Sequence, residues 1–270
     1  MTIVDVPGAK LHYDIRGSGP LLLLIPGANG DARPFTALAE HLAPYFTVAT
    51  YDRRGFSRSA LDGPQDYSHR LDTDAHDAQL LIEHTGHRTA TVLGTSSGAI
   101  VALHLLTRHP ATVTHVVAYE PPAVRLLHDR QRWIDFFHQV YDLYRRSGIA
   151  PAMTLFRERT FTAPDARAMA RAMDLTNPRI RANATYWFEH ELRQYPTTDL
   201  DLDTLAVHAD QISPATGRES SGLPCYKAGA ELAATLNRKP IELPGGHVGF
   251  ATQPAEFADE LRRSLGHHAP

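Results

Sequence analysis

Residues 94–98 carry the strongest chemical signal in this sequence, because they form a G-x-S-x-G motif with Ser96 at its centre. The residues before it, 90–93, predict a strand, and residues 99–103 after it predict a helix. A sharp turn between the two needs small residues and holds the central serine in a strained backbone conformation. Its hydroxyl then projects above the sheet. We therefore predict that Ser96 is the nucleophile of an acyl-transfer reaction.

His247 is the predicted base for this serine, since a hydroxyl is a poor nucleophile until a base takes its proton. It ends the segment 243–247, Leu-Pro-Gly-Gly-His, directly after a predicted strand at 240–243. A histidine that follows the nucleophile in the chain and lies in a strand-end loop has the order that enzymes with this motif use. Of the sixteen histidines in the chain, only His247 has this placement.

A carboxylate is needed to hold the imidazole in the correct tautomer, and Glu120 is the favoured candidate. It ends the strand predicted at 114–119, which follows the nucleophile's helix, and the rigid pair Pro121-Pro122 comes next. Neighbouring strands lie about 4.8 Å apart, so a glutamate one strand over can reach a histidine above Ser96.

Glu219 and Asp210 are the alternative acids, because both flank the strand predicted at 212–216. In most enzymes with this motif the acid follows the strand before the last one, three residues beyond a glycine. Here the residue three beyond Gly217 is Ser220, which has no carboxylate, and Glu219 is one position away. The residues alone leave this choice open.

Two backbone N–H groups are predicted to stabilise the negative charge that develops on the attacked carbonyl oxygen. One belongs to Ser97, the residue after the nucleophile, at the positive end of the predicted helix. The other belongs to Ala28, in the turn 26–30 that follows the apolar run 21–25.

The elements that must position these residues alternate between strand and helix, which predicts a doubly wound α/β fold. The run 21–25 is apolar throughout, as in a strand that is buried on both faces of a mostly parallel sheet. We expect eight strands with helices on both faces. The predicted strands are 2–6, 11–15, 21–25, 46–51, 90–93, 114–119, 212–216 and 240–243, and the predicted helices are about 34–43, 72–85, 98–107, 226–236 and 254–265.

Residues 123–196 interrupt this alternation, because they show no strand pattern and their aromatic residues recur at roughly helical spacing. We predict a helical cap inserted over the site, with a core domain formed by residues 1–122 and 197–270. Most of the cap's aromatic side chains are expected to pack with one another, and some are expected to face a pocket.

Composition limits the classes of function. The 270 residues suit one large domain with an insertion, and a net charge of -3 spread over both signs predicts neither a nucleic-acid nor a membrane partner. The single cysteine, Cys225, excludes an internal disulfide, and no leader or membrane-spanning pattern is visible. We expect a cytoplasmic protein, and a homodimer stays open.

Asp72, Asp74, His76 and Asp77 form the densest polar group, but metal-ligand motifs such as H-E-x-x-H are absent from the sequence. We interpret this group as the solvated face of an amphipathic helix and predict no metal. Asp52, at a strand end, is expected to hydrogen-bond the loop that frames the pocket rather than to act in catalysis.

With these features the chain resembles the α/β-hydrolase family over essentially its whole length. Within that family it resembles the zearalenone hydrolases, which open a resorcylic macrolactone. The resemblance rests on residues 90–92, 94–99 and 243–247 and on Glu120 before a proline.

This resemblance implies that Glu120 is the triad acid and that Ala28 and Ser97 are the oxyanion donors. It also implies that a cap tryptophan, Trp187, lines the substrate pocket. The cap sequence and the oxyanion turn depart from the family pattern. The resemblance therefore implies less about the substrate than about the catalytic residues.

We expect a serine hydrolase that cleaves a carboxylic ester, and foremost a lactone similar to the zearalenone macrolactone, without a cofactor. One alternative is a carbon-carbon bond hydrolase or a perhydrolase on the same triad. Another, from a different class, is a non-catalytic receptor for a small ligand.

Overall fold

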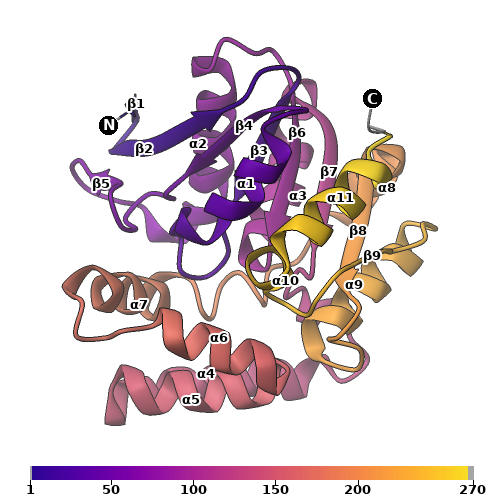
Figure 1. The fold of residues 1–270 in the computed structure, drawn as a ribbon. Helices are drawn as coiled ribbons and strands as arrows, with labels where there is room; N and C mark the ends of the chain where they lie inside the picture. The colour runs from indigo at the N-terminus through magenta and orange to yellow at the C-terminus, as the bar shows by residue number, and fades with distance from the viewer. Residues whose placement is uncertain (1, 267–270) are drawn as a thin grey trace.

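A mostly parallel sheet forms the centre of the computed structural model, which describes residues 2–266 (Figure 1). The strand order is β1-β2-β4-β3-β6-β7-β8-β9, and β5 pairs with β2. Pairings that involve β1, β2 or β5 are antiparallel, and the others are parallel. Eight strands were predicted, and the ninth is the two-residue β5. The strands are β1 (Thr2–Val6), β2 (Ala9–Arg16), β3 (Leu21–Ile25), β4 (Thr47–Tyr51), β5 (Ala60–Leu61), β6 (Ala90–Thr95), β7 (Val113–Tyr119), β8 (Ile212–Gly217) and β9 (Ile241–Leu243).

The side chains of β3 alternate between two apolar cores, one on each face of the sheet. Leu22 and Leu24 join the core that includes side chains of α1, α10 and α11, whereas Leu21, Leu23 and Ile25 join the core that includes α2, α3, α8 and α9. Helices therefore cover both faces, as predicted. The helices are α1 (Thr36–Leu42), α2 (Arg70–His84), α3 (Ser97–Arg108), α8 (Leu202–Val207), α9 (Pro224–Thr235), α10 (Gly249–Thr252) and α11 (Pro254–Ser264).

Four further helices lie together at one end of the sheet (Figure 1), and we call them the cap helices. They are α4 (Arg130–Ser147), α5 (Ile149–Thr160), α6 (Ala163–Ala172) and α7 (Pro178–His190). Their buried aromatic and aliphatic side chains form a third apolar cluster, which also takes in Phe56 and Ile100 from outside the cap helices. As predicted, residues 123–196 contain no strand.

Several details differ from the sequence prediction, among them the four-residue helix α10, which was not predicted. The first hairpin turns at Pro7 and Gly8 alone, where four residues were predicted, and the positive φ of 77° at Gly8 makes that short turn possible. The helix α8 was not predicted. It is only six residues long, and Asp201 caps its first turn by accepting a hydrogen bond from the Thr204 N–H.

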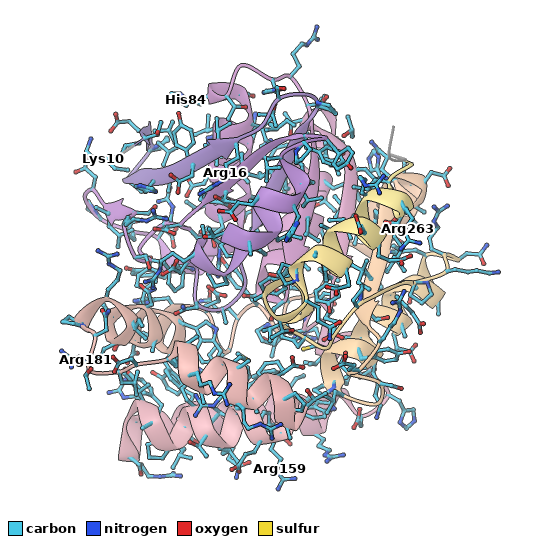
Figure 2. All side chains as sticks on the ribbon, in the orientation of Figure 1. Lys10, Arg16, His84, Arg159, Arg181 and Arg263 are labelled. Carbon is cyan, nitrogen blue, oxygen red and sulfur yellow. The ribbon has the colours of Figure 1, made fainter. Side chains whose placement is uncertain are left out.

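No helix within residues 2–266 is both long enough and apolar enough to cross a membrane. The basic side chains labelled in Figure 2 lie well apart, with Lys10 on β2, Arg159 and Arg181 on cap helices and Arg263 on α11.

Candidate active site

Ser96 lies at the turn between β6 and α3, with φ 54° and ψ -127°. Both glycines of the motif are required by close packing. A Cβ at Gly94 would lie 2.3 Å from the carbonyl oxygen of Gly98, and a Cβ at Gly98 would lie 2.3 Å from the carbonyl oxygen of Ile25. The strained conformation holds the Ser96 side chain out over the sheet.

Ser96 and His247 line one cavity of about 330 Å³ between the strand ends and the cap helices. His247 lies in the loop after β9 and is 4% exposed. The Ser96 hydroxyl has no hydrogen-bond partner in residues 2–266. Its proton is therefore available for transfer to a base in the cavity. The Ser96 and His247 side chains border the same space, as a nucleophile and its base must.

Glu120 provides the carboxylate that contacts His247. Its Oε2 lies 2.7 Å from Nδ1 of His247, and its Oε1 accepts hydrogen bonds from the Gly217 N–H at 2.9 Å and from the Ser220 hydroxyl. Glu120 is 1% exposed and has a positive φ of 46° at the end of β7. A buried carboxylate with three partners is held in one orientation.

The two alternative acids lie elsewhere. Glu219 is exposed and accepts a hydrogen bond from the Gln253 side chain at 2.9 Å. Asp210 pairs with Arg238 at 2.9 Å, and its side chain is 99% exposed. Ser220, which the sequence analysis set aside because it lacks a carboxylate, instead supports Glu120 from the strand end where the acid is usually found.

Ala28 and Ser97 present the two predicted backbone donors. Ala28 lines the cavity beside Ser96, and Ser97 is the first residue of α3. The first N–H groups of a helix have no partner within it, and neither of these two N–H groups has an acceptor in the described chain. Both are therefore available to a negatively charged oxygen next to Ser96.

Burial keeps two neutral groups near this site protonated. Burial raises the pKa of the Tyr119 hydroxyl well above its ordinary value, and the charge of Glu120 adds to the effect, so Tyr119 donates a hydrogen bond to the carbonyl oxygen of Gly246. Burial likewise raises the pKa of the Cys225 thiol, again reinforced by Glu120. Cys225 is therefore a thiol, not a reactive thiolate, and does not compete with Ser96.

Asp165 is a site residue that the sequence analysis missed. Its carboxylate, 3% exposed on cap helix α6, accepts a hydrogen bond from the His247 N–H at 2.9 Å. The pattern Thr162-x-x-Asp165 resembles a capping box, and the Thr162 side chain does accept from the Asp165 N–H. That signal could have located the start of the helix but not the contact with His247, which is 82 residues away.

Replacing Asp165 with Ala should loosen the histidine loop, because the backbone N–H groups of His247 and Val248 lose their acceptor. We expect the free energy of unfolding to fall by about 1–3 kcal/mol and kcat to fall about tenfold as His247 becomes misplaced. Urea denaturation and steady-state kinetics measure the two effects. Asp174→Ala is the control, since the Asp174 carboxylate accepts hydrogen bonds only from Thr176 in an exposed turn of the same segment. Equal kcat in the two variants would contradict a positioning role for Asp165.

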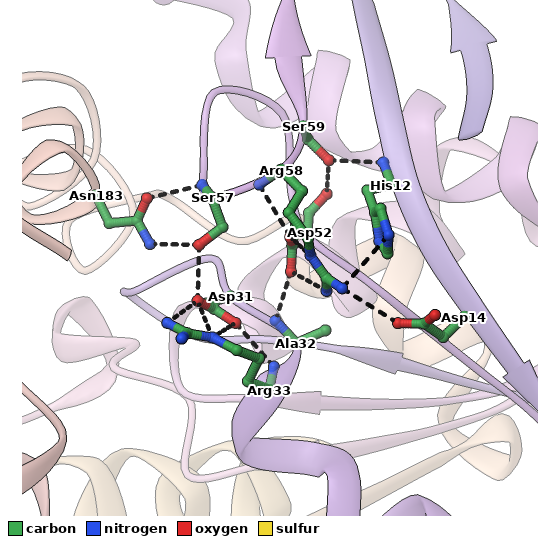
Figure 3. A network of polar contacts seen from close by, with 10 residues as sticks. All are labelled: His12, Asp14, Asp31, Ala32, Arg33, Asp52, Ser57, Arg58, Ser59 and Asn183. Carbon is green, nitrogen blue, oxygen red and sulfur yellow. Dashed lines mark hydrogen bonds and ion pairs between the residues drawn. The ribbon is translucent and has the colours of Figure 1, made fainter. Parts of the chain in front are cut away.

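A polar network holds the loop after β3 in place (Figure 3). Asp52 accepts hydrogen bonds from the Ala32 N–H at 2.9 Å and from the Arg58 Nε at 2.6 Å, so it organises the loop as predicted. Asp31 accepts from Ser57, and Ser57 in turn is held by Asn183 of cap helix α7. The network thus joins the loop after β3, the loop after β4 and the cap (Figure 3).

The polar face of α2 is not solvated throughout, and this prediction was wrong for two of its residues. Asp74 and Asp77 are each 1% exposed, because Arg53 and Arg54 from the loop after β4 pair with them at 2.8 and 2.7 Å. A buried carboxylate needs such a partner. No group of three or more His, Cys, Asp or Glu residues within 2–266 is arranged to hold a metal ion.

The cavity is mostly apolar beyond Ser96 and His247. Trp187 lines it, as the resemblance implied, and packs against Phe156 with ring centroids 5.1 Å apart. Of the four methionines in the chain, the three beyond Met1 all line it from the cap: Met153, Met169 and Met173. A larger hollow of about 450 Å³ near Tyr67 is lined by none of the predicted site residues.

Comparison with known proteins agrees with this geometry. A model of the alpha/beta hydrolase family matches residues 22–260. The chain is 36% identical over 267 residues to the uncharacterized hydrolase YraK of Bacillus subtilis. The aligned region covers 97% of this chain and 94% of that protein. It is 26% identical to a zearalenone hydrolase of Cladophialophora bantiana, over 95% of this chain and 93% of that one, so the predicted resemblance is confirmed. The crystal structure of the enol-lactonase from Burkholderia xenovorans LB400 has a TM-score of 0.74 at 19% identity, covering 98% of this chain and all (100%) of that one.

Proposed function

The chain belongs to the alpha/beta hydrolase family, and from this premise we propose that it hydrolyses carboxylic esters, foremost lactones, through an acyl-enzyme on Ser96. One observation carries the proposal. His247, which is paired with the buried Glu120, lines the same cavity as Ser96, whose hydroxyl has no hydrogen-bond partner within residues 2–266. A nucleophile, a base and an orienting acid in that relation support acyl transfer.

In the first step the Ser96 oxygen bonds to the carbonyl carbon while Nε2 of His247 takes the hydroxyl proton. Glu120 binds the other ring nitrogen, Nδ1, and so holds the tautomer in which Nε2 can accept that proton. The carbonyl electron pair moves onto oxygen, where the N–H groups of Ala28 and Ser97 stabilise it.

In the second step the tetrahedral intermediate collapses and the bond from carbon to the alcohol oxygen breaks. The imidazolium of His247 gives its proton to that oxygen, which in a lactone stays attached to the acyl chain. Water then attacks the acyl-enzyme with His247 as base, and the free acid leaves with Ser96 restored.

Support for a lactone comes from the similarity to a zearalenone hydrolase and from the character of the cavity. Its cap wall is built of methionine, alanine and aromatic side chains, which suit a bulky apolar ring system. Methionine side chains adapt their shape to irregular ligands at low cost. A lactone also needs no room for a departing alcohol, because the product remains one molecule.

The proposal is tested by labelling and by a substrate screen. A fluorophosphonate should modify Ser96, as read by mass spectrometry of the peptide, and a screen should include a resorcylic macrolactone, small lactones, aryl esters and diketones. We expect hydrolysis of lactones and aryl esters. Cleavage of diketones without ester turnover would favour a carbon-carbon bond hydrolase, and the absence of both labelling and turnover would favour a receptor.

Trp187→Phe should change specificity more than general activity, because the smaller ring leaves space in the cap wall while Phe156 keeps an aromatic partner. We expect kcat/KM for the macrolactone to fall roughly tenfold. The value for a small acetate ester should stay within about threefold, since a small acyl group does not fill that space. Equal losses for both substrates would show that Trp187 does not contact the substrate.

A further inference from the structure

A cluster of four buried charged side chains lies directly behind the oxyanion turn. Arg53, Arg70, Asp74 and Glu191 are each no more than 2% exposed. Nη1 of Arg53 lies 2.8 Å from Asp74, and Nη2 of Arg53 lies 2.9 Å from both oxygens of Glu191. Arg70 lies 3.7 Å from each carboxylate, so two positive and two negative charges balance. None of the four side chains lines the cavity that holds Ser96 and His247, and none forms a hydrogen bond or ion pair with a member of the triad.

Arg53 also binds the peptide that carries one oxyanion donor. Its Nη2 donates to the carbonyl oxygen of Gly27 at 2.8 Å, and the Gly30 N–H donates to the same oxygen at 2.8 Å. The Gly27 carbonyl and the Ala28 N–H belong to one trans peptide and point in opposite directions. Hydrogen bonds that fix the Gly27 carbonyl oxygen therefore also fix the direction of the Ala28 N–H. A charged donor on that oxygen polarises the peptide further.

Glu191 reaches the other oxyanion residue. The Ser97 hydroxyl donates to Oε1 of Glu191 at 2.6 Å, and both groups are buried. This carboxylate comes from the segment just after cap helix α7, 94 residues from Ser97 in the chain. One ion pair, Arg53 with Glu191, therefore contacts the peptide that carries the Ala28 N–H and the side chain of Ser97.

We propose that Arg53 and Glu191 are positioning residues that hold the Ala28 and Ser97 N–H groups in the geometry of an oxyanion hole. The inference rests on the proposed function, because it assumes that an oxyanion forms beside Ser96. It gives the loop after β4 and the end of the cap a role in aligning the oxyanion donors. A shift of the cap that moved Glu191 would misalign the donors.

Arg53 and Asp74 keep their charges across the working pH range. Burial alone would lower the pKa of Arg53, but the charges of Glu191 and Asp74 outweigh it and raise the pKa. Burial would raise the pKa of Asp74, but Arg70 and Arg53 outweigh it and lower that pKa.

The test compares Arg53→Lys and Ser97→Ala with the wild type and with Arg54→Lys as matched control. Arg54 is the adjacent residue, is also buried and pairs with Asp77, but contacts neither oxyanion residue. Ser97→Ala removes the hydroxyl and leaves the backbone N–H in place. Of the variants, it should disturb the fold least. Four quantities are measured: kcat and KM for an aryl ester, and the inhibition constants of an alkyl trifluoromethyl ketone and of the methyl ketone with the same chain.

The trifluoromethyl ketone mimics the intermediate, because Ser96 adds to its carbonyl, the electron pair moves onto oxygen, and His247 takes the proton. Removal of a whole oxyanion donor costs about 10²- to 10³-fold. Misalignment by Arg53→Lys should cost a fraction of that, roughly 10- to 100-fold, and Ser97→Ala about 10-fold. These losses should appear equally in kcat and in trifluoromethyl ketone affinity, while KM and methyl ketone affinity stay within about twofold. Arg54→Lys should show neither loss.

Two failures are distinguishable. If the wild type hydrolyses the ester and binds the trifluoromethyl ketone more tightly than the methyl ketone, but both variants behave like Arg54→Lys, the positioning role is wrong and the proposed function stands. If the wild type itself shows no ester turnover and no preference for the trifluoromethyl ketone, the proposed function fails, and the inference fails with it.

Discussion

Replacing Ser96 with Ala is expected to lower kcat for ester hydrolysis by roughly a millionfold. The loss is this large because no other serine and no cysteine of residues 2–266 lines the cavity, and Cys225, which lines a neighbouring hollow, is held as a neutral thiol. Alanine adopts the same strained backbone conformation as serine, so the fold and thermal stability should be unchanged. Stopped-flow and steady-state assays on an aryl ester measure the rate, and thermal unfolding checks the fold.

Ser68→Ala serves as the control for this variant, because Ser68 is an exposed serine that contacts only Asp66 and His69. Its kcat should equal that of the wild type. Turnover by Ser96→Ala at more than about one hundredth of the wild-type rate, with fluorophosphonate labelling retained, would overturn the assignment of the nucleophile.

Glu120→Gln should lower kcat by about 10⁴-fold, through the tautomer of His247. Oε1 of Glu120 accepts from the Gly217 N–H and the Ser220 hydroxyl, so the carbonyl oxygen of a glutamine at this position would stay there. Its NH₂ group would then face Nδ1 of His247 and donate to it. That contact favours the tautomer with a proton on Nε2, which cannot take the proton of Ser96.

Glu219→Gln is the matched control, since Glu219 follows the neighbouring strand β8 and contacts Gln253 instead of His247. Its kcat should stay within about twofold of the wild type. Measuring kcat for both variants on the same aryl ester decides between the two acids. A large loss in Glu219→Gln with an active Glu120→Gln would reverse the assignment.

Local sequence was sufficient to predict the α/β order, the turn at Ser96 and the loop at His247. Each of these features depends on residues within one turn or one strand of the chain, where spacing alone sets the geometry. Glycines 94 and 98 are an example. The packing that requires them follows from the sharp turn between β6 and α3, which the motif itself encodes.

The choice of acid was different, because it depended on which side chain crosses from one strand to another. The residues left Glu120, Glu219 and Asp210 open, and the resemblance favoured Glu120. The contact that distinguishes them joins residues 127 apart in the chain. The twist of the sheet and the path of the loops bring these two residues together, and neither can be predicted from the spacing of residues along the chain.

The supporting groups were not predictable in the same way. Asp165 and Glu191 lie in the cap and contact residues of the site. Asp74 can be buried because Arg53, from a different loop, pairs with it. A carboxylate in an amphipathic helix pattern is normally solvated, and nothing local distinguishes one that is paired in the interior. The sequence by itself determined which residues can do the chemistry, since covalent neighbours set the shape of the motif. Only the tertiary structure decided which charges hold those residues in place, since packing of distant segments brings the partners together.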